Sequence, residues 1–266
     1  MSAASRAAAV WQRRQVLRTL VVRDLRVRYA QSWLGYVWTV LDPLAMSLIY
    51  FVVFVGIFKR GDVGHRPYFL FLVIGLLSWQ LFSSSVTDTA RSLIQDARLV
   101  RSTNLPREIW VVRVVLAKTV EYLYALPVLV LFTVVYAVRG EVHFNSRLLL
   151  FPVGILLQFV LLVGVGLLLA PVTALVNDMQ RVVRILLRMA FYLTPVLYAP
   201  SRVPEPWRLL IDLNPMTGVL ELLRAGFFHD ELQWRSVWVS LVGGVVLLVV
   251  GSWAFTRLER SVLKEI

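Results

Sequence analysis

The stretch 148–177, LLLFPVGILLQFVLLVGVGLLLAPVTALVN, contains 30 consecutive residues without a charged side chain, bounded by Arg147 and Asp178. A helix needs roughly 20 mostly apolar residues to cross the hydrocarbon core of a membrane, because every backbone N–H and C=O must be bonded within the segment there. A second run of 21 uncharged residues lies between Arg235 and Arg257. These stretches predict an all-α integral membrane protein.

The composition of the whole chain agrees with this class. Of 266 residues, 58% are hydrophobic and 17% are charged, and the mean hydropathy is +0.71. A soluble domain of this length needs more polar surface. We expect one transmembrane domain, residues 1–266, with six transmembrane helices at about 36–58, 68–87, 109–138, 148–176, 182–199 and 236–257.

Two of these spans contain charged residues. The predicted fifth span, 182–199, contains Arg184 and Arg188 at its cytoplasmic end. The third contains Arg113, Lys118 and Glu121, which we expect near one mouth, where long side chains can snorkel to the membrane surface.

The net charge of +12 comes from 25 Arg and 3 Lys. With the N-terminus in the cytoplasm, 19 of these 28 basic residues fall on cytoplasmic segments, so the positive-inside rule predicts that both termini are cytoplasmic. Basic residues at membrane borders are explained by this rule and by anionic lipid, so we expect contact with membrane lipids and no nucleic-acid partner. Cysteine is absent, which excludes disulfides and thiol chemistry. No small-residue cleavage site precedes the first apolar run, so a removable signal peptide is not expected.

Residues 9–30 are long enough for a helix outside the spans. Leu17, Leu20, Val21 and Leu25 fall on one face and Arg18, Arg23 and Arg26 on the other, although Asp24 intrudes on the apolar arc. The pattern fits either a basic anchor or an amphipathic helix lying in the cytoplasmic interface.

A second helix outside the spans is predicted over 91–105, between spans two and three. Leu93, Ala97 and Val100 recur at helical spacing among charged residues, and Asn104-Leu105-Pro106 ends the helix. This is either a solvated connecting helix or a helix that docks on a cytoplasmic partner.

Arg181, Arg184 and Arg188 form a basic stripe at positions i, i+3 and i+7, at the cytoplasmic mouth of span five. The stripe fits either snorkelling to lipid headgroups or a site for phosphate or pyrophosphate.

The outer segment 199–235 is too apolar for an ordinary loop. Pro-Glu-Pro at 204–206 precedes one short helical stretch, and Asn214-Pro215 has the pattern of an N-cap followed by proline at the first helical position. Two half-helices around a break predict a re-entrant hairpin over 204–229.

Several kinds of chemistry are absent from the sequence. No lysine stands in a P-loop motif, the three histidines lie singly, and no acidic pair suggests a metal-dependent enzyme. Aromatic residues are abundant instead: Tyr50, Phe54 and Phe58 form a stripe on span one, with Trp33, Tyr36 and Trp38 at its inner end. Such rings either pack and form an interface belt or stack on sugar faces.

The run 23–54 resembles the opening of the permease subunits of ABC-2-type polysaccharide exporters. That family has R-D-x-x-x-R-Y-x-x-S-x-L-G followed by W-x-x-x-x-P, matched here by Arg23, Asp24, Arg28, Tyr29, Ser32, Leu34, Gly35, Trp38 and Pro43. The likeness continues in L-V-R-x-x-x-L-P-R-E (99–108) and L-N-P-M-T-x-x-x-E-x-x-R (213–224). Asp42 stands where the family more often has Gln or another polar residue, so no role is assigned to it.

The resemblance implies a function for each segment outside the spans. It implies that 9–30 is an interface helix and that 91–105 is a coupling helix seated on an ATPase subunit. The coupling residues would be Leu93, Asp96, Ala97, Leu99, Val100, Arg101 and Asn104. The hairpin 204–229 would be a gate that includes Trp207, Asn214, Pro215, Glu221 and Arg224.

The resemblance further implies a homodimer in the bacterial inner membrane, with two nucleotide-binding ABC ATPase subunits that hold ATP and Mg, and no cofactor or metal in this chain. The substrate would be a polyprenyl-pyrophosphate-linked glycan, such as O-antigen, a galactan or teichoic acid. The headgroup would meet Arg26, Arg28, Tyr29, Arg181, Arg184 and Arg188, and the six aromatic residues named above would line the glycan path.

The alternatives are an ABC-2 permease for a drug, haem or lipid, a membrane-embedded glycan-assembly enzyme or flippase partner outside the ABC class, and a stand-alone channel or scaffold.

Overall fold

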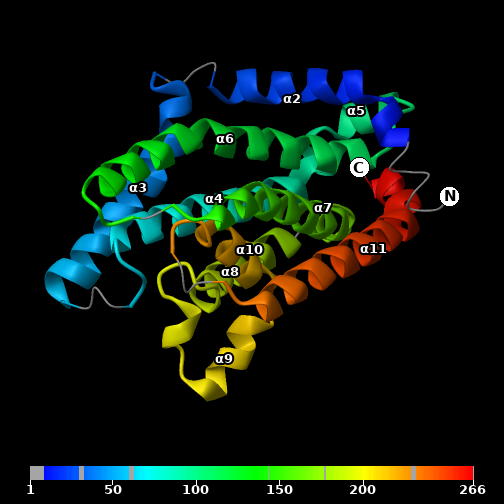
Figure 1. Cartoon of the computed structure of the whole chain (residues 1–266). Helices are drawn as coiled ribbons and strands as arrows, with labels where there is room; N and C mark the ends of the chain where they lie inside the picture. Colours follow the sequence, from blue (N-terminus) through cyan, green and yellow to red (C-terminus); the bar gives the residue numbers. More distant parts are fainter. Residues whose placement is uncertain are drawn as a thin grey trace.

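A computed structural model describes residues 9–29, 33–59, 63–142, 144–176, 178–228 and 232–265, and every regular element in these ranges is helical (Figure 1). The longer helices are α2 (Arg14–Tyr29), α3 (Trp38–Phe51), α4 (Tyr68–Gln95), α6 (Glu108–Val138), α7 (Phe151–Leu175), α8 (Met179–Leu193) and α11 (Trp234–Glu265). The shorter ones are α5 (Ala97–Ser102), α9 (Glu205–Asp212) and α10 (Pro215–Arg224). Three short 3-10 helices, η1 (Gly35–Val37), η3 (Ser146–Leu150) and η4 (Pro200–Arg202), and a π-helical segment, η2 (Val52–Ile57), complete the set in the described ranges.

Five helical segments are long and apolar enough to cross a membrane: Trp38–Ile57, Tyr68–Gln95, Glu108–Val138, Ser146–Leu175 and Trp234–Glu265. They correspond to the predicted spans one, two, three, four and six. In the predicted fifth span, α8 has 15 residues and ends at Leu193, because Thr194 is extended and Pro195 follows. A helix of that length is about 22 Å long, less than the core thickness of about 30 Å. The structure therefore supports five of the six predicted spans, and the fifth, 182–199, stays a prediction.

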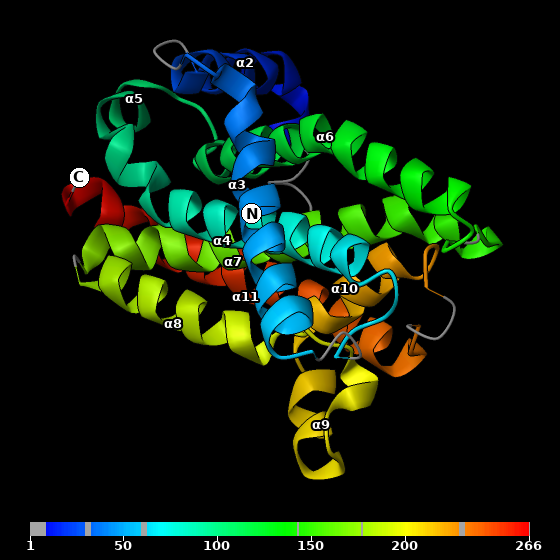
Figure 2. The ribbon, with the colours of Figure 1, turned by 90° about the vertical axis from the view of Figure 1, so that its left-hand side faces the viewer.

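The centre of the bundle is formed by α4 and α7. In the most apolar window of α4, 72% of the residues are buried, against 11% in the corresponding window of Trp38–Ile57, which comprises α3 and η2. Helices α3 and α6 pack on α4, and α11 packs on α7 (Figures 1 and 2). Between α4 and α7, the Ser78 hydroxyl donates to Oε1 of Gln158 at 3.1 Å and Nε2 of Gln158 donates to the Ser78 carbonyl at 2.8 Å. Such polar groups pair inside the bundle because lipid offers them no partner.

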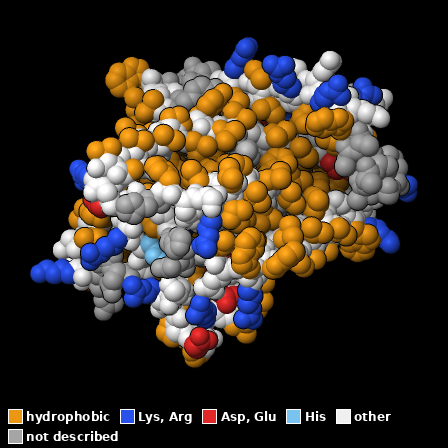
Figure 3. All heavy atoms as spheres, viewed as in Figure 1, with side chains coloured by type: hydrophobic (Ala, Val, Ile, Leu, Met, Phe, Trp, Pro, Cys, Tyr) orange, Lys and Arg blue, Asp and Glu red, His pale blue; other side chains and the backbone are white. Residues whose placement is uncertain are grey.

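The surface carries a broad apolar zone. In the space-filling view, apolar side chains cover the middle of the face, and Lys and Arg gather over α2 and around α9 (Figure 3). An apolar middle between basic edges is typical of a chain that crosses a membrane several times.

Glycines bring α7 and α11 into close contact. A Cβ at Gly251 would lie 2.4 Å from the carbonyl oxygen of Gly164, and a Cβ at Gly164 would lie 2.6 Å from the backbone nitrogen of Leu248. Small residues at helix interfaces allow such an approach in membranes, where close packing replaces the hydrophobic effect as the driving force.

We therefore expect Gly251→Ala to lower the free energy of unfolding by about 1–3 kcal/mol, through overpacking. The measurement is thermal unfolding of the purified protein in detergent. Gly244→Ala on the same helix is the control, since its Cβ would have no neighbour nearer than 3.8 Å. Equal losses in the two variants would contradict the close-contact interpretation.

Two predicted segments have different limits in the structure. The helix predicted over 91–105 is divided: α4 continues to Gln95, Asp96 leaves the helical conformation, and α5 ends at Ser102. The hairpin predicted over 204–229 consists of α9 and α10, and its last residue lies outside the described ranges. In both views α9 projects from the body of the protein (Figures 1 and 2).

Candidate functional site

A pocket of about 530 Å³ lies between α3, α4 and α8. It is lined by Asp42, Pro43, Met46 and Tyr50 from α3, by Leu76, Trp79, Gln80, Ser83 and Thr87 from α4, and by Arg184, Leu187, Arg188, Phe191 and Tyr192 from α8. On each helix these positions recur every three or four residues, so one face of each helix contributes to the wall. We call this the α3–α4–α8 pocket.

The pocket brings two of the predicted headgroup residues together. All three arginines of the stripe are exposed. Arg184 and Arg188, one turn apart on α8, line the pocket, and Arg181 does not. Guanidinium groups match the oxygens of phosphate with a fork of donors. The hydroxyls of Ser83 and Thr87 line the same pocket and add further hydrogen-bonding groups.

Aromatic rings line the pocket beside these polar groups. The ring of Phe191 lies 6.2 Å from Tyr50, 5.5 Å from Trp79 and 5.2 Å from Tyr192, measured between centroids. Aromatic faces of this kind bury the apolar C–H surface of a ligand while hydroxyl groups stay hydrogen-bonded. The pocket therefore offers both cationic and aromatic contacts to one ligand.

The predicted aromatic stripe on span one is only partly in this pocket. Ring centroids of Tyr50 and Phe54 lie 6.5 Å apart and those of Phe54 and Phe58 lie 6.4 Å apart, so the stripe is continuous. Of the three, Tyr50 lines the pocket, and Phe54 packs on Tyr68. Other members of the predicted path lie elsewhere: the side chains of Trp33 and Trp38 are exposed, and that of Tyr36 lies outside the described side chains.

The α2 helix packs on α6 through a small apolar contact. Val21 and Leu25 are buried against Ala117, with Leu17 alongside. The apolar face of α2, which the sequence suggested could lie in the membrane interface, therefore packs against α6. On another face of α2, Arg26 lines a groove of about 620 Å³ with Arg18 and Arg23. The side chain of Tyr29 lies outside the described ones.

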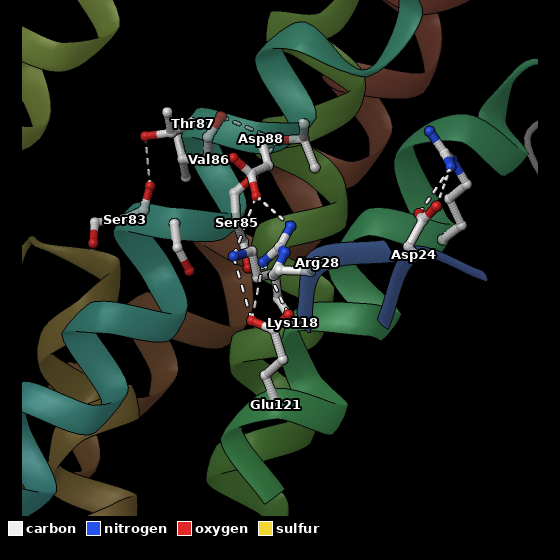
Figure 4. A network of polar contacts seen from close by, with 12 residues as sticks. Asp24, Arg28, Ser83, Ser85, Val86, Thr87, Asp88, Lys118 and Glu121 are labelled. Atoms are coloured by element: carbon white, nitrogen blue, oxygen red, sulfur yellow. Dashed lines mark hydrogen bonds and ion pairs between the residues drawn. The ribbon is translucent and has the colours of Figure 1, made fainter. Parts of the chain in front are cut away.

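Arg28 belongs to a ring of four charges, which we call the Arg28 ring. Its Nη1 donates to both carboxylate oxygens of Glu121, at 2.9 and 3.0 Å, and its Nη2 donates to Asp88 at 2.9 Å (Figure 4). The Lys118 ammonium lies 3.2 Å from Asp88 and 3.3 Å from Glu121. Arg28 is thus already paired with acids, whereas Arg184 and Arg188 form no ion pair within the described residues.

A second ring, the Arg113 ring, lies nearer α5. Nη1 of Arg113 donates to both oxygens of Asp24, at 2.9 and 2.8 Å, and Nη2 donates to Asp96. Arg23 contacts the same two acids, Asp24 at 3.0 Å and Asp96 at 3.4 Å. Asp24, which intrudes on the apolar face of α2, is therefore the partner of Arg113.

The prediction that the charges of span three snorkel is wrong. The side chain of Arg113 is 4% exposed, and those of Lys118 and Glu121 are each 10% exposed. They are paired with opposite charges because an unpaired charge costs several kcal/mol or more in a medium of low dielectric constant. Lone acidic and basic residues within apolar segments indicated that buried ion pairs exist. The sequence could not show which residues pair, because Arg28 and Glu121 are 93 positions apart and no local pattern connects them.

The predicted coupling residues lie at the end of α4, in α5 and just beyond it, and they are divided between a buried and an exposed side. Leu93 of α4 and Val100 of α5 are buried within the chain, and Asp96 points to the Arg113 ring. Leu99, Arg101 and Asn104 are exposed, and Ala97 is half-buried. Of the residues predicted to contact an ATPase, the exposed ones can reach a partner, while the buried ones hold α5 in place.

In the α9–α10 hairpin, the predicted cap is confirmed: the Asn214 side chain accepts from the backbone N–H of Met216, with Pro215 in the first turn. Its amide also donates to the Thr194 hydroxyl at 2.8 Å, beyond the end of α8. Trp207 is exposed on α9. The other two predicted gate residues, Glu221 and Arg224 on α10, are buried, and Glu221 accepts from the backbone N–H of Gln233 at 3.0 Å.

Among the predicted gate residues, Arg224 makes the most polar contacts. Nη1 donates to the Pro195 carbonyl at 2.7 Å, and Nη2 donates to the carbonyls of Val196 and Phe71 at 2.8 and 3.3 Å. Its guanidinium carbon lies 3.5 Å from the centroid of the Phe71 ring. Arg224 thus joins α10 to α4 and to the segment that follows α8.

Comparison with known proteins gives a consistent result. The sequence matches the model of the ABC-2 type transporter family over residues 15–228. It is similar to an O-antigen export system permease protein of Klebsiella pneumoniae, 30% identical over 237 residues with 89% of each chain covered. It is also similar to one of Myxococcus xanthus, 29% identical over 258 residues with 96% of this chain and 95% of the relative covered. A polysialic acid transport protein of Escherichia coli is 25% identical over 206 residues, covering 77% of this chain and 78% of the relative.

Proposed function

The chain belongs to the ABC-2 type transporter family, and we propose that it is the transmembrane subunit of an ATP-driven exporter of a lipid-linked cell-envelope polysaccharide. The relatives are permeases for O-antigen or transport proteins for polysialic acid, which favours a polysaccharide over a drug or lipid. Membership of the family also sets aside a glycan-assembly enzyme outside the ABC class and a stand-alone channel.

The observation that carries the proposal is the α3–α4–α8 pocket. A polyprenyl-pyrophosphate-linked glycan has an anionic headgroup joined to sugars, and the pocket places Arg184 and Arg188 next to the rings of Tyr50, Trp79 and Phe191. The arginines would bind the pyrophosphate and the rings would stack on the first sugars.

Further parts of the proposal concern assembly. We propose a homodimer, since one small bundle cannot surround a polymer, and two ATPase subunits that bind ATP and Mg in place of this chain. The exposed residues of α5 would contact the ATPase. In this arrangement α8 and the following segment form the predicted fifth span. Both termini are cytoplasmic in the bacterial inner membrane, and α9–α10 closes the outer end of the path.

The direct test is transport in vesicles that contain this chain and its ATPase. We expect ATP-dependent movement of a polyprenyl-pyrophosphate-linked oligosaccharide across the bilayer, and none with a non-hydrolysable nucleotide. Movement of a fluorescent phospholipid in place of the glycan would contradict the proposed substrate class.

The double substitution Leu99→Asp with Arg101→Asp tests the ATPase contact. We expect the affinity for the ATPase to fall by more than about a hundredfold, so that little ATPase co-purifies, because two anchors at the centre of an interface contribute about 2 kcal/mol each. The yield of folded permease should stay the same, since both side chains are exposed.

A matched control is Leu213→Asp with Arg202→Asp, an exposed pair of the same residue types beside α9. This control should leave co-purification unchanged. If the α5 double variant still retained the ATPase, the assignment of α5 as the contact would be wrong.

A further inference from the structure

The two charge rings connect α2 to different parts of the bundle. The Arg28 ring joins α2 to α4 and α6 through Asp88, Lys118 and Glu121. The Arg113 ring joins α2 to α6 and to Asp96, the residue that separates α4 from α5. The C-terminal end of α2, at Arg28, is therefore bound to α4 and α6. Arg23, earlier on α2, is bound to Asp96 at the start of α5.

Charges as well as apolar contacts hold α2 against the bundle. The apolar cluster beneath α2 has Val21, Leu25 and Ala117 as its buried members. The two rings contain four basic and four acidic side chains, and in each ring both bases contact both acids. Apolar side chains of similar size would often stabilise such a contact at least as well, so the charges favour a role in orientation or movement.

The Arg113 ring can stay formed while the helices that carry it shift relative to one another. Because Arg23 and Arg113 each contact both Asp24 and Asp96, one ion pair can lengthen while the other pairs still hold the carboxylates. Arg113 itself is fixed in α6, with its guanidinium carbon 4.9 Å from the centroid of the Trp110 ring. A shift of α5 moves Asp96 and thereby pulls on Arg23 of α2.

We propose that the Arg113 ring is the joint that transmits a displacement of α5 to α2. The chain continues from α2 through η1 to α3, which forms one wall of the α3–α4–α8 pocket. Movement at the ATPase contact therefore reaches the pocket wall through α2. Asp24 and Arg113 are positioning residues in this scheme, which rests on the proposed function for the source of the movement.

The joint itself is tested on the permease alone. The chain has no cysteine, so spin labels can be placed at Gln15→Cys on α2 and Ser102→Cys on α5, both exposed positions. In lipid nanodiscs, we expect a narrow distribution of distances between the labels. Asp24→Asn should broaden it, and Arg18→Gln, an exposed position on the same helix, should not. An unchanged distribution in Asp24→Asn would overturn the proposal.

The transmission is tested in the complex with the ATPase. We expect Asp24→Asn to retain the ATPase and its basal hydrolysis while the glycan moved per ATP falls about tenfold, the size of a typical coupling energy. Asp24→Glu should restore transport, because it keeps the carboxylate. If Asp24→Asn lowers only the melting temperature and transport per folded protein is normal, the ring is merely structural and the proposal fails. If the unmodified permease did not co-purify with the ATPase, the proposed function would be wrong. The distances between the spin labels would still test whether the Arg113 ring joins α5 to α2.

Discussion

Replacing Arg224 with methionine will lower the free energy of unfolding by about 3–5 kcal/mol, because several buried carbonyls lose their donor and each costs about 1–3 kcal/mol when left unpaired. The guanidinium of Arg224 donates to the carbonyls of Pro195, Val196 and Phe71. Methionine fills part of the volume but has no N–H group. We expect α10 to lose its fixed position against α4 and export to stop. Thermal unfolding in detergent and the yield of monodisperse protein measure the effect.

Arg208→Met is the matched control for this change. Arg208 lies on the neighbouring helix α9, where it contacts Glu205 at 3.7 Å, a residue whose side chain is 89% exposed. Exposed pairs of this kind contribute about 0–1 kcal/mol, so the control should unfold near the temperature of the unmodified protein. Similar losses in the two variants would show that Arg224 is not specifically required for stability.

The contrast between these two arginines shows what the sequence could and could not reveal. The pattern L-N-P-M-T-x-x-x-E-x-x-R predicted the cap at Asn214 and the helix that follows, because caps are local and depend on adjacent residues. It did not reveal what Arg224 contacts, since its partner at Phe71 lies 153 positions away in the chain. Local structure was therefore predictable, and the partners of buried charges were not.

The same distinction explains the errors in the helices. Five spans were predictable because length and apolar composition decide them. The single helix expected over 91–105 is divided at Asp96, whose carboxylate contacts Arg113 and Arg23, and local sequence does not reveal this tertiary contact. The predicted headgroup residues also differ from one another in the structure. Arg28 on α2 is paired with acidic residues, whereas Arg184 and Arg188 on α8 line a pocket.

The double substitution Arg184→Glu with Arg188→Glu is expected to reduce export of the lipid-linked glycan by at least about a hundredfold, since two charge-assisted contacts are lost and each contributes about 1.5–3 kcal/mol. Both side chains are exposed in this chain, so the fold should tolerate the change. The reversed charge would also repel a pyrophosphate. ATP-dependent transport into vesicles, corrected for the amount of folded complex, provides the measurement.

Arg181→Glu separates the two interpretations of the arginine stripe. Arg181 is an exposed member of the same helix that does not line the α3–α4–α8 pocket. If the pocket binds the headgroup, Arg181→Glu should export at nearly the normal rate and the double variant should not. If the stripe serves only to meet anionic lipid, each single reversal at 181, 184 or 188 should have a similar and small effect, because headgroup attraction contributes about 1 kcal/mol per basic residue. A strong loss confined to the pocket-lining pair would therefore favour substrate binding over lipid contact.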